Sequence, residues 1–401
     1  MKKIALAVMA AAVAVAPLAS AQAAQSGGEL APLISASTGR VAGEYIVAVS
    51  QGQDPAAVAK SMGVKPTFVY TGAFLGFAMK ADAGKVQAIR ANPQKVKSVS
   101  ENKIFRAPEV KAEPAGITQT NSSWGLDRID QRNLPLNKQY TYSQQASSVR
   151  AYVIDSGIDT DHPQFGGRAI NMYSAYGGSG GDCMGHGTHV AGIIGSSKYG
   201  VAKLAQLRGV KVTQGCGTTS DAAHLLAGID WVYNNGLKPA VVNMSIAGPM
   251  DFNVNTAATN LVNKGFFVAG AGGNDGEDAC TTSPASAIGV MGVAASKAND
   301  QHWISADNQS AYGFCVDIYA PGVSIISTWV NSSSNPDSVY LTSGTSQATP
   351  FVAGAAAIIK ANNPSFTPQN IQDWLVGNGT YGALTNVPWG TPNVLLYKGS
   401  L

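Results

Sequence analysis

The sequence predicts an α/β protein whose parallel β-sheet is covered by helices on both faces. From residue 123 onward, continuous apolar runs such as RAYVIDSG, PAVVNMSI and KGFFVAGAG alternate with helix-like segments such as HVAGIIGS and DAAHLLAGIDWVYNN. Strands buried on both faces read as unbroken apolar runs, and strands that alternate with helices indicate a parallel sheet. Functional sites in such sheets lie beyond the carboxyl ends of the strands. Polar motifs directly after an apolar run are therefore the first candidates for chemistry.

An earlier unit is predicted over residues 43–108. The run GEYIVAVS alternates apolar and polar residues as a strand does, and PTFVYTGAFLGFAMKA and VKSVSENKIFRA are also strand-like. PAAVAKSM and AGKVQAIRAN are helix-like, so the unit is expected to be a small α+β domain. The following stretch, APEVKAEPAGITQTNSS, is rich in Pro, Ala and polar residues. It is predicted to be a linker that proteases can reach.

The first 23 residues have a basic start, an apolar middle and a small-residue end. This order is typical of a secretory signal peptide. A transmembrane anchor is the alternative, but Pro17 and the run ASAQA disfavour it. No later stretch reaches the ~18 apolar residues that span a bilayer. We therefore expect a secreted, extracellular protein with no membrane contact once the signal peptide is removed.

Composition narrows the class of protein further. The chain has 401 residues, of which 45% are hydrophobic and 13% are charged, which excludes a disordered protein. The net charge of +3 comes from a basic N-terminal third, and the remainder is mildly acidic. This distribution lacks the basic patch expected of a protein that binds nucleic acid.

Three motifs could carry chemistry. AYVIDSGIDTDHP places Asp155 just after an apolar strand, DCMGHGTHVAGIIG places His186 at the start of a helix, and LTSGTSQATPFVAG places Ser346 at the start of another. A serine hydroxyl is a poor nucleophile at neutral pH, so a histidine must take its proton and a carboxylate must orient that histidine. Asn274, in FFVAGAGGNDG, follows a strand, and its amide could stabilise an oxyanion together with the N–H of Ser346. Each motif alone is common as a cap or turn, but together they favour a serine hydrolase.

Two other classes remain open at this point. Cys183, His186 and His189 lie close together in sequence and could hold zinc. However, four cysteines in an exported chain favour two disulfides instead. The second class is a binding protein of the same fold without activity, against which the complete set of Asp, His and Ser motifs argues.

The motifs resemble those of the subtilisin-like serine proteases (peptidase family S8), in the proteinase K and aqualysin branch. The resemblance is carried by VIDSGI, GHGTHVAG, VVNMSI, AGGN, YAPG and SGTSQATPFVAG, and WGLDRIDQRNLPLN and GTPNVLLY extend it from Trp124 to Tyr397. It implies a three-layer sandwich with a central, mostly parallel sheet flanked by helices over residues 119–401. Before it would come a pro-peptide, residues 24–118, whose small α+β domain acts as chaperone and inhibitor.

The resemblance also implies a function. The protein would be a monomeric, secreted serine endopeptidase that acts on polypeptides through an acyl-enzyme intermediate. Asp155 would orient His186, His186 would be the general base, Ser346 the nucleophile and Asn274 the oxyanion donor. The chain would mature by self-cleavage near residues 115–123, with its own pro-peptide as intramolecular inhibitor.

A substrate cleft follows from the same resemblance. One wall would offer the backbone of Ser245, Ile246, Ala247 and Gly248. GCGTTS, with Gly215 and Gly217, would form the opposite edge strand. The small residues Ala271, Gly272 and Gly273 would leave room in the main specificity pocket. We therefore expect broad specificity, with an apolar or aromatic side chain before the scissile bond.

The resemblance also implies two disulfides and bound calcium, and the sequence differs from the usual family pattern at two positions. The implied disulfides are Cys183–Cys216 and Cys280–Cys315. Structural calcium, which binds six to eight oxygens, is expected at two sites, with no catalytic metal or organic cofactor. The first site would use Asp127, Asp130, Gln131 and Asn137, and the second Asp317 with the carbonyls of Ile288 and Val290. Gln347 and Phe351 stand where the family usually has Met and His.

Overall fold

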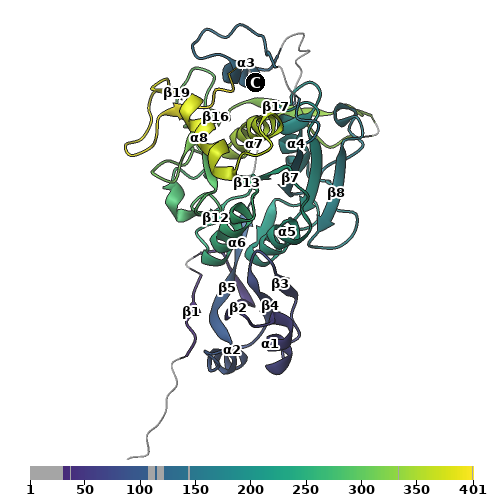
Figure 1. Cartoon of the computed structure of the whole chain (residues 1–401), viewed down its shortest axis with the longest axis vertical. Helices are drawn as coiled ribbons and strands as arrows, with labels where there is room; N and C mark the ends of the chain where they lie inside the picture. Colours follow the sequence, from purple (N-terminus) through teal and green to yellow (C-terminus); the bar gives the residue numbers. More distant parts are fainter. Residues whose placement is uncertain are drawn as a thin grey trace, which may run out of the picture.

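The computed structural model describes residues 30–36, 38–106, 113–114, 122–142, 145–332, 334–399 and 401. The predicted signal peptide lies outside these residues. Figure 1 shows a small N-terminal unit at one end of a larger α/β body. Among the helices of the described ranges, none combines the length and apolar character needed to cross a membrane.

The elements of the N-terminal unit are β1 Leu33–Ile34, β2 Arg40–Val49, α1 Pro55–Ser61, β3 Phe68–Thr71, β4 Leu75–Lys80, α2 Ala83–Arg90 and β5 Val96–Arg106. The elements that follow are β6 Glu113–Pro114, α3 Trp124–Asp130, β7 Arg150–Asp155, η1 Pro163–Phe165, β8 Ala169–Ser174, α4 His186–Gly195, β9 Gln206–Lys211, β10 Thr219–Asp221, α5 Ala222–Asn235, β11 Ala240–Met244, β12 Gly248–Pro249, α6 Phe252–Asn263, β13 Phe267–Ala271, η2 Ala279–Thr281, β14 Thr282–Ser283, β15 Met291–Ser296, β16 Ile318–Pro321, β17 Ile325–Thr328, β18 Val339–Thr342, α7 Thr345–Asn362, α8 Pro368–Asn378, β19 Thr380–Tyr381 and β20 Val394–Leu395.

A nine-stranded sheet forms the centre of the body. Its strand order is β19-β20-β16-β15-β13-β11-β7-β9-β8. All neighbouring pairs are parallel except β19 and β20, which are antiparallel. The prediction of a central, mostly parallel sheet is confirmed.

Helices cover both faces of this sheet, as the alternating side chains of β7 show. Ala151 and Val153 belong to an apolar core that includes side chains of α4 and α7. Tyr152 and Ile154 point the other way, into a second core with α5 and α6. Successive side chains of a strand face opposite sides of a sheet, so this division defines three layers. The predicted α/β sandwich is therefore confirmed.

The N-terminal unit is a sheet of order β1-β5-β2-β4-β3, packed against α1 and α2. It begins at Leu33, earlier than the predicted residue 43. One face of the sheet, which includes Val47 and Phe77, packs on the unit's own helices. The other face contributes Ile46 and Tyr70 to the core that also contains α5 and α6. Figure 1 shows β2, β3 and β4 next to these two helices.

Two strand pairings join the N-terminal unit and the stretch that follows it to the body. β5 pairs antiparallel with β10, where Arg106 lies opposite Thr219. Beyond residues 107–112, which are not described, β6 pairs antiparallel with β18, where Glu113 lies opposite Leu341. Within the predicted linker, residues 113–114 thus form backbone hydrogen bonds with an edge strand of the body. Residues 115–121, where most of the predicted self-cleavage region falls, lie outside the described residues.

A carboxylate of α5 holds the turn between β3 and β4. Asp230 Oδ1 accepts the backbone N–H groups of Gly72 and Ala73, both at 2.8 Å. Burial raises the pKa of Asp230, although these backbone hydrogen bonds oppose the shift. A Cβ on Gly72 would lie 2.3 Å from Oδ1 of Asn234, so the turn fits closely only without a side chain there.

Candidate active site

Four polar residues meet at the carboxyl edge of three adjacent strands. Asp155 is the last residue of β7, Ser245 follows the last residue of β11, and Asn274 comes three residues after the end of β13. β7, β11 and β13 are neighbours in the sheet. His186 opens α4, which packs against α7. The position of the predicted site at the strand ends follows the general rule for open parallel sheets.

Asp155 and His186 form a buried pair. Oδ1 of Asp155 lies 2.8 Å from Nδ1 of His186. The same oxygen accepts the N–H of Ser156 at 2.7 Å, which fixes the carboxylate. Asp155 is fully buried and His186 is 1% exposed. A carboxylate at Nδ1 selects the tautomer in which Nε2 is free to accept a proton.

Two glycines position His186 at the helix start. Gly185 has φ +107°, and a Cβ there would lie 2.1 Å from Cε2 of Trp329. A Cβ on Gly187 would lie 2.1 Å from the carbonyl oxygen of Gly157. Both contacts are too short for any side chain, so the sequence GHG is required by the close approach of backbone and ring.

The charge state of His186 reflects its neighbours. Burial lowers the pKa of the imidazole, but the charge of Asp155, its hydrogen bond and the charge of Asp182 outweigh that effect. The pKa of His186 is therefore raised above its ordinary value of 6.5. A raised pKa makes the histidine a stronger base.

This shift gives a testable pH profile. A general base acts only when it is deprotonated, so kcat/KM is expected to fall as the pH drops through a pKa above 6.5. Burial lowers the pKa of two other histidines, His189 to about 3 and His302 to about 4, so neither should titrate in this range. The measurement is kcat/KM from pH 5 to 10. His224→Gln should leave the acid limb in place, and an acid limb at or below pH 6.5 would contradict the assignment.

His189 has a structural role. Its Nε2 lies 3.1 Å from the carbonyl oxygen of Ile325 and 3.2 Å from that of Tyr340. These acceptors require a proton on Nε2. Because burial keeps the ring neutral, His189 serves as a fixed hydrogen-bond donor between β17 and β18.

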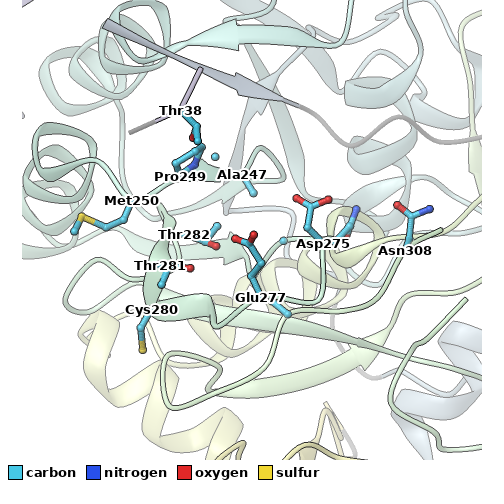
Figure 2. A pocket seen from close by; sticks show the side chains of 15 residues that line it. Thr38, Ala247, Pro249, Met250, Asp275, Glu277, Cys280, Thr281, Thr282 and Asn308 are labelled. Atoms are coloured by element: carbon cyan, nitrogen blue, oxygen red, sulfur yellow. The ribbon is translucent and has the colours of Figure 1, made fainter. Parts of the chain in front are cut away.

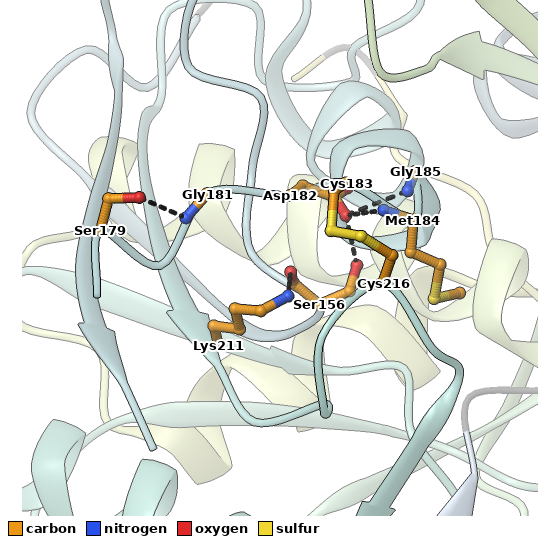
Figure 3. Close-up of a disulfide and its surroundings, with 9 residues drawn as sticks. All are labelled: Ser156, Ser179, Gly181, Asp182, Cys183, Met184, Gly185, Lys211 and Cys216. Atoms are coloured by element: carbon orange, nitrogen blue, oxygen red, sulfur yellow. Dashed lines mark hydrogen bonds between the residues drawn. A yellow bond between two sulfur atoms is a disulfide. The ribbon is translucent and has the colours of Figure 1, made fainter. Parts of the chain in front are cut away.

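The cysteine before α4 is joined to Cys216 in a disulfide, shown in Figure 3, and Cys280 is joined to Cys315. Both predicted pairings are confirmed. Because Cys183 has no free thiolate, the alternative of a zinc site with His186 and His189 is wrong.

Asp182, beside this disulfide, was not predicted from the sequence. Its Oδ1 accepts the N–H groups of Met184 and Gly185 and the hydroxyl of Ser156, at 2.9 to 3.0 Å. Its other oxygen, Oδ2, accepts hydrogen bonds from the N–H and the Oγ1 hydroxyl of Thr188, at 3.0 and 2.6 Å. Figure 3 shows its bonds to Ser156, Met184 and Gly185. An acidic residue a few positions before a predicted helix start is the sequence signal that could have identified this carboxylate as an acceptor for N–H groups at the start of α4.

Ser346 is fully buried near the start of α7. Its Oγ donates a hydrogen bond to the carbonyl oxygen of Ser245 at 2.8 Å, and Ser245 Oγ donates to the carbonyl of Ser346 at the same distance. Nε2 of His186 is buried and has no hydrogen-bond partner among the described residues. In this structure, therefore, the predicted nucleophile is bonded to the cleft wall and not to the predicted base.

Asn274 has a defined orientation. Its Oδ1 accepts hydrogen bonds from N and Oγ1 of Thr345, at 2.9 and 2.8 Å. These two donors identify Oδ1 and turn the opposite nitrogen, Nδ2, toward the backbone of Gly344. Nδ2 donates no hydrogen bond to the described part of the chain, so it is available to a ligand beside Ser346.

A cavity of about 790 Å³ adjoins Asn274. Ala247 and Gly248 line one side and Gly272 and Gly273 another, as expected for the main specificity pocket. Figure 2 shows Thr38 of the N-terminal unit across the opening from Thr282. The side chain of Ile246 is not part of this wall, because it is buried in the core with α5 and α6. Ala271 is likewise buried, at the end of β13.

The expected edge strand over residues 215–220 is misplaced. The strand is β10, which begins at Thr219. Gly215, with φ +54°, and Gly217 lie in the preceding turn, where Gly217 N donates to the carbonyl of Gln214 at 2.9 Å. The disulfide at Cys216 joins this turn to Cys183.

The first expected calcium site is a cluster of oxygen atoms around one loop. Oδ1 of Asp127 and Oε1 of Gln131 both lie 3.3 Å from the backbone nitrogen of Asn137. Oδ2 of Asp130 accepts the N–H of Thr141 at 2.7 Å, whereas its Oδ1 is buried and accepts nothing from the described residues. An unsatisfied buried carboxylate oxygen fits a cation ligand.

The second expected calcium site centres on Asp317. Its Oδ2 accepts the N–H of Gly292 at 2.7 Å. Burial raises the pKa of this carboxyl group to about 6 in spite of that bond. Val290 ends the turn that leads into β15, two residues before Gly292, so its backbone lies in the same region as Asp317. A buried carboxyl group with this pKa is stabilised in its charged form by a neighbouring cation.

The fold and the site define the class of protein. The model of the subtilase family (peptidase S8) matches residues 146–388. The chain belongs to this family and is a serine endopeptidase.

Individual relatives agree with this class. The chain is 40% identical over 337 residues to the extracellular serine proteinase of Thermus sp. (strain Rt41A), covering 84% of this chain and 78% of that protein. It is 38% identical over 381 residues to Proteinase R of Parengyodontium album, covering 92% of each. Among solved structures, a cold adapted subtilisin-like serine proteinase is similar with a TM-score of 0.65 and 40% identity, covering 70% of this chain and 99% of that one.

Proposed function

We propose that this endopeptidase is secreted and cleaves polypeptides through Asp155, His186 and Ser346. The observation that carries the proposal is the buried Asp155–His186 pair at the strand ends, next to the helix that presents Ser346. Secretion is supported by the signal-peptide pattern of residues 1–23 and by the relatives named as extracellular proteinases.

The proposed mechanism begins with a rotation of the Ser346 side chain. Its Oγ leaves the carbonyl of Ser245 and turns toward Nε2 of His186, which has no hydrogen-bond partner among the residues that the structure describes. Oγ then attacks the substrate carbonyl carbon while its proton passes to Nε2. His186 returns the proton to the leaving amine. Water then attacks the acyl-enzyme with His186 again as the base, and the acyl group leaves Ser346 Oγ, which recovers its proton. Asp155 stabilises the imidazolium that forms in each half of the reaction.

Asn274 is proposed to stabilise the tetrahedral intermediate. Thr345 fixes its oxygen, so Nδ2 can donate to the oxyanion together with the N–H of Ser346. The helix N-terminus beside Ser346 also favours negative charge. The small walls of the pocket support a broad preference for apolar and aromatic side chains before the scissile bond.

A serine-directed covalent inhibitor tests this proposal. Treatment of the purified protein with a sulfonyl fluoride is expected to abolish hydrolysis of a peptide 4-nitroanilide and to add one label to the peptide that contains Ser346. The measurement is mass spectrometry of the digested protein beside a rate assay. Full activity after complete labelling of Ser346, or inactivation with the label elsewhere, would contradict the assignment.

We further propose that the N-terminal unit is an intramolecular inhibitor that the protein removes by self-cleavage. Support comes from the two pairings that flank residues 107–112, β5 with β10 and β6 with β18. Support also comes from Phe105, which is fully buried and would lie 2.6 Å from a Cβ on Gly248 of the cleft wall. An N-terminal unit seated there competes with a substrate for the same edge.

Calcium is proposed to stabilise the fold without taking part in catalysis. Asp130 with Asp127, Gln131 and Asn137 would hold one ion, and Asp317 with the carbonyls of Ile288 and Val290 another. A ligand that binds only the folded state adds about 2.7 kcal/mol at 100 times its Kd. Chelation is therefore expected to lower the midpoint of thermal unfolding and to leave the initial rate at low temperature unchanged.

Calorimetry and rate assays, with and without a strong chelator, check this expectation. Asp317→Asn should reduce the effect of calcium on the midpoint, and Asp307→Asn, an exposed carboxylate that is not one of the expected calcium ligands, serves as its control. An unfolding midpoint that calcium does not change would overturn the proposal.

A further inference from the structure

Two ionisable side chains next to the Asp155–His186 pair have no part in the proposed mechanism. Lys211, the last residue of β9, lies beside Asp155 in the sheet and is only 7% exposed. Asp182 comes four residues before His186 and is partly buried. A buried charge is costly unless hydrogen bonds and opposite charges compensate it, so the contacts of these two side chains need an explanation.

Ser156, which is fully buried, connects both side chains to the pair. Its carbonyl oxygen accepts a hydrogen bond from Nζ of Lys211 at 2.6 Å, and its Oγ donates to Oδ1 of Asp182 at 3.0 Å (Figure 3). Its N–H donates to Oδ1 of Asp155, the same oxygen that lies 2.8 Å from Nδ1 of His186. Within the described ranges, Lys211 forms no ion pair within 4.0 Å of either carboxylate. The connection therefore runs through Ser156.

Asp182 also holds the backbone on both sides of His186. Its Oδ1 accepts the N–H of Gly185, the residue before His186, at 3.0 Å. The N–H of Gly187, the residue after His186, donates at 2.9 Å to Oγ of Ser156, which in turn donates to Asp182. Both oxygens of Asp182 accept N–H groups, and such bonds favour the ionised carboxylate. Asp182 therefore carries a negative charge at the turn that presents the imidazole.

Few other charged groups face His186. The elements packed against α4 are β7, β9, β17, α7 and η1, and of these β17 and η1 carry no ionisable side chain. On the strands, only Asp155 and Lys211 lie at the carboxyl edge beside His186. Burial lowers the pKa of His186, whereas the charges of Asp155 and Asp182 raise it. His189, on α4 itself, stays neutral because burial lowers its pKa to about 3. The remaining ionisable side chains lie further along these elements or on the opposite face of the sheet: Arg150, Tyr152, Arg208 and Lys360.

We propose that Asp182 is a positioning residue for the general base: through Ser156 it holds Asp155 and His186 in one arrangement, and its charge, balanced by Lys211, stabilises the imidazolium that forms in each half of the reaction. This inference rests on the proposed function, because His186 is the base there. A negative charge near an imidazole favours its protonated form, and a positive charge disfavours it. Asp182 and Lys211 should therefore act on the protonation of His186 in opposite directions.

The acid limb of kcat/KM tests this proposal in three single variants, each normalised by titration of active sites with a serine-directed inhibitor. Asp182→Asn removes the negative charge, so the limb is expected about 0.5 to 1 pH unit below that of the wild type, and the plateau about 10-fold lower. Lys211→Met removes the positive charge, so the limb is expected to lie above that of the wild type. Ser156→Ala keeps both charges but removes the bridging hydroxyl, so it should lower the plateau and leave the limb in place.

The matched control is Asp278→Asn, because Asp278 is also a carboxylate beside a disulfide and accepts the N–H of Cys280 at 2.9 Å. It should leave the acid limb at the wild-type position.

A purely structural role of Asp182 would reduce the number of active sites without moving the limb of those that remain. An acid limb that is unmoved in both Asp182→Asn and Lys211→Met, or that moves in the same direction in both, would overturn the inference. If Asp182→Asn does not fold, Lys211→Met decides alone: an upward shift supports the inference, and an unmoved limb overturns it. Failure of the proposed function has a different signature, because wild-type activity would then survive complete labelling of Ser346.

Discussion

Ser346→Ala is expected to yield a precursor that keeps residues 24–118 attached. Without the hydroxyl group no acyl-enzyme can form, so peptide hydrolysis should fall by about 10⁶-fold, the size of effect known for removal of a catalytic serine. Self-cleavage depends on the same group and should stop as well. Expression in a protease-free host, followed by mass spectrometry of the intact protein, measures both results.

The control is Ser148→Ala, which removes an exposed hydroxyl just before the amino end of β7, whereas Asp155 lies at the carboxyl end of that strand. This variant should mature and cleave peptides like the wild type. Normal removal of the N-terminal unit from Ser346→Ala in the same host would show that another protease performs the cleavage. A loss of peptide hydrolysis in that correctly processed variant would still support Ser346 as the nucleophile.

Asn274→Ala is expected to lower kcat about 10²- to 10³-fold with little change in KM. The amide is placed to donate at the position of the developing oxyanion, and a donor used only in the transition state affects kcat. The N-terminal unit should still be removed by self-cleavage, but more slowly. Steady-state kinetics on one peptide substrate, with active-site titration, give the two constants separately.

Asn308→Ala is the matched control, because Asn308 lines the same cavity but its side chain forms no hydrogen bond with residues 344–346 in the described part of the chain. It should not reproduce the loss in kcat. A rise in KM at constant kcat in Asn274→Ala would contradict the oxyanion role. It would mean that the amide of Asn274 binds the substrate and the transition state equally well.

The parts of the site that lie directly after strands could be predicted from sequence. Asp155 and Asn274 follow continuous apolar runs, and parallel strands bring their carboxyl ends to one edge. His186 and Ser346 stand at predicted helix starts, which the structure reproduces as α4 and α7. These predictions depend only on short-range patterns and on one general rule of sheet geometry.

Other features depended on contacts between distant residues. The pairing of Arg106 with Thr219 and of Glu113 with Leu341 joins segments more than a hundred residues apart, which no local pattern indicates. β10 begins only at Thr219, after a turn whose Cys216 is joined to the distant Cys183. The orientation of Ser346 toward Ser245 is a rotamer choice, set by a neighbouring carbonyl that the sequence does not locate.

The turn at residues 71–73 has a consequence for the evolution of the N-terminal unit. Asp230 binds this turn through backbone N–H groups, which every residue except proline provides. These bonds do not depend on the side chains at positions 71 and 73, although the side chain of Ala73 is fully buried in the core with α5 and α6, and position 72 has no room for a Cβ. A diverged N-terminal unit would thus keep these two bonds if it retained a glycine at the centre of the turn, but its fit to the body would still depend on buried side chains such as Ile46, Tyr70 and Phe105.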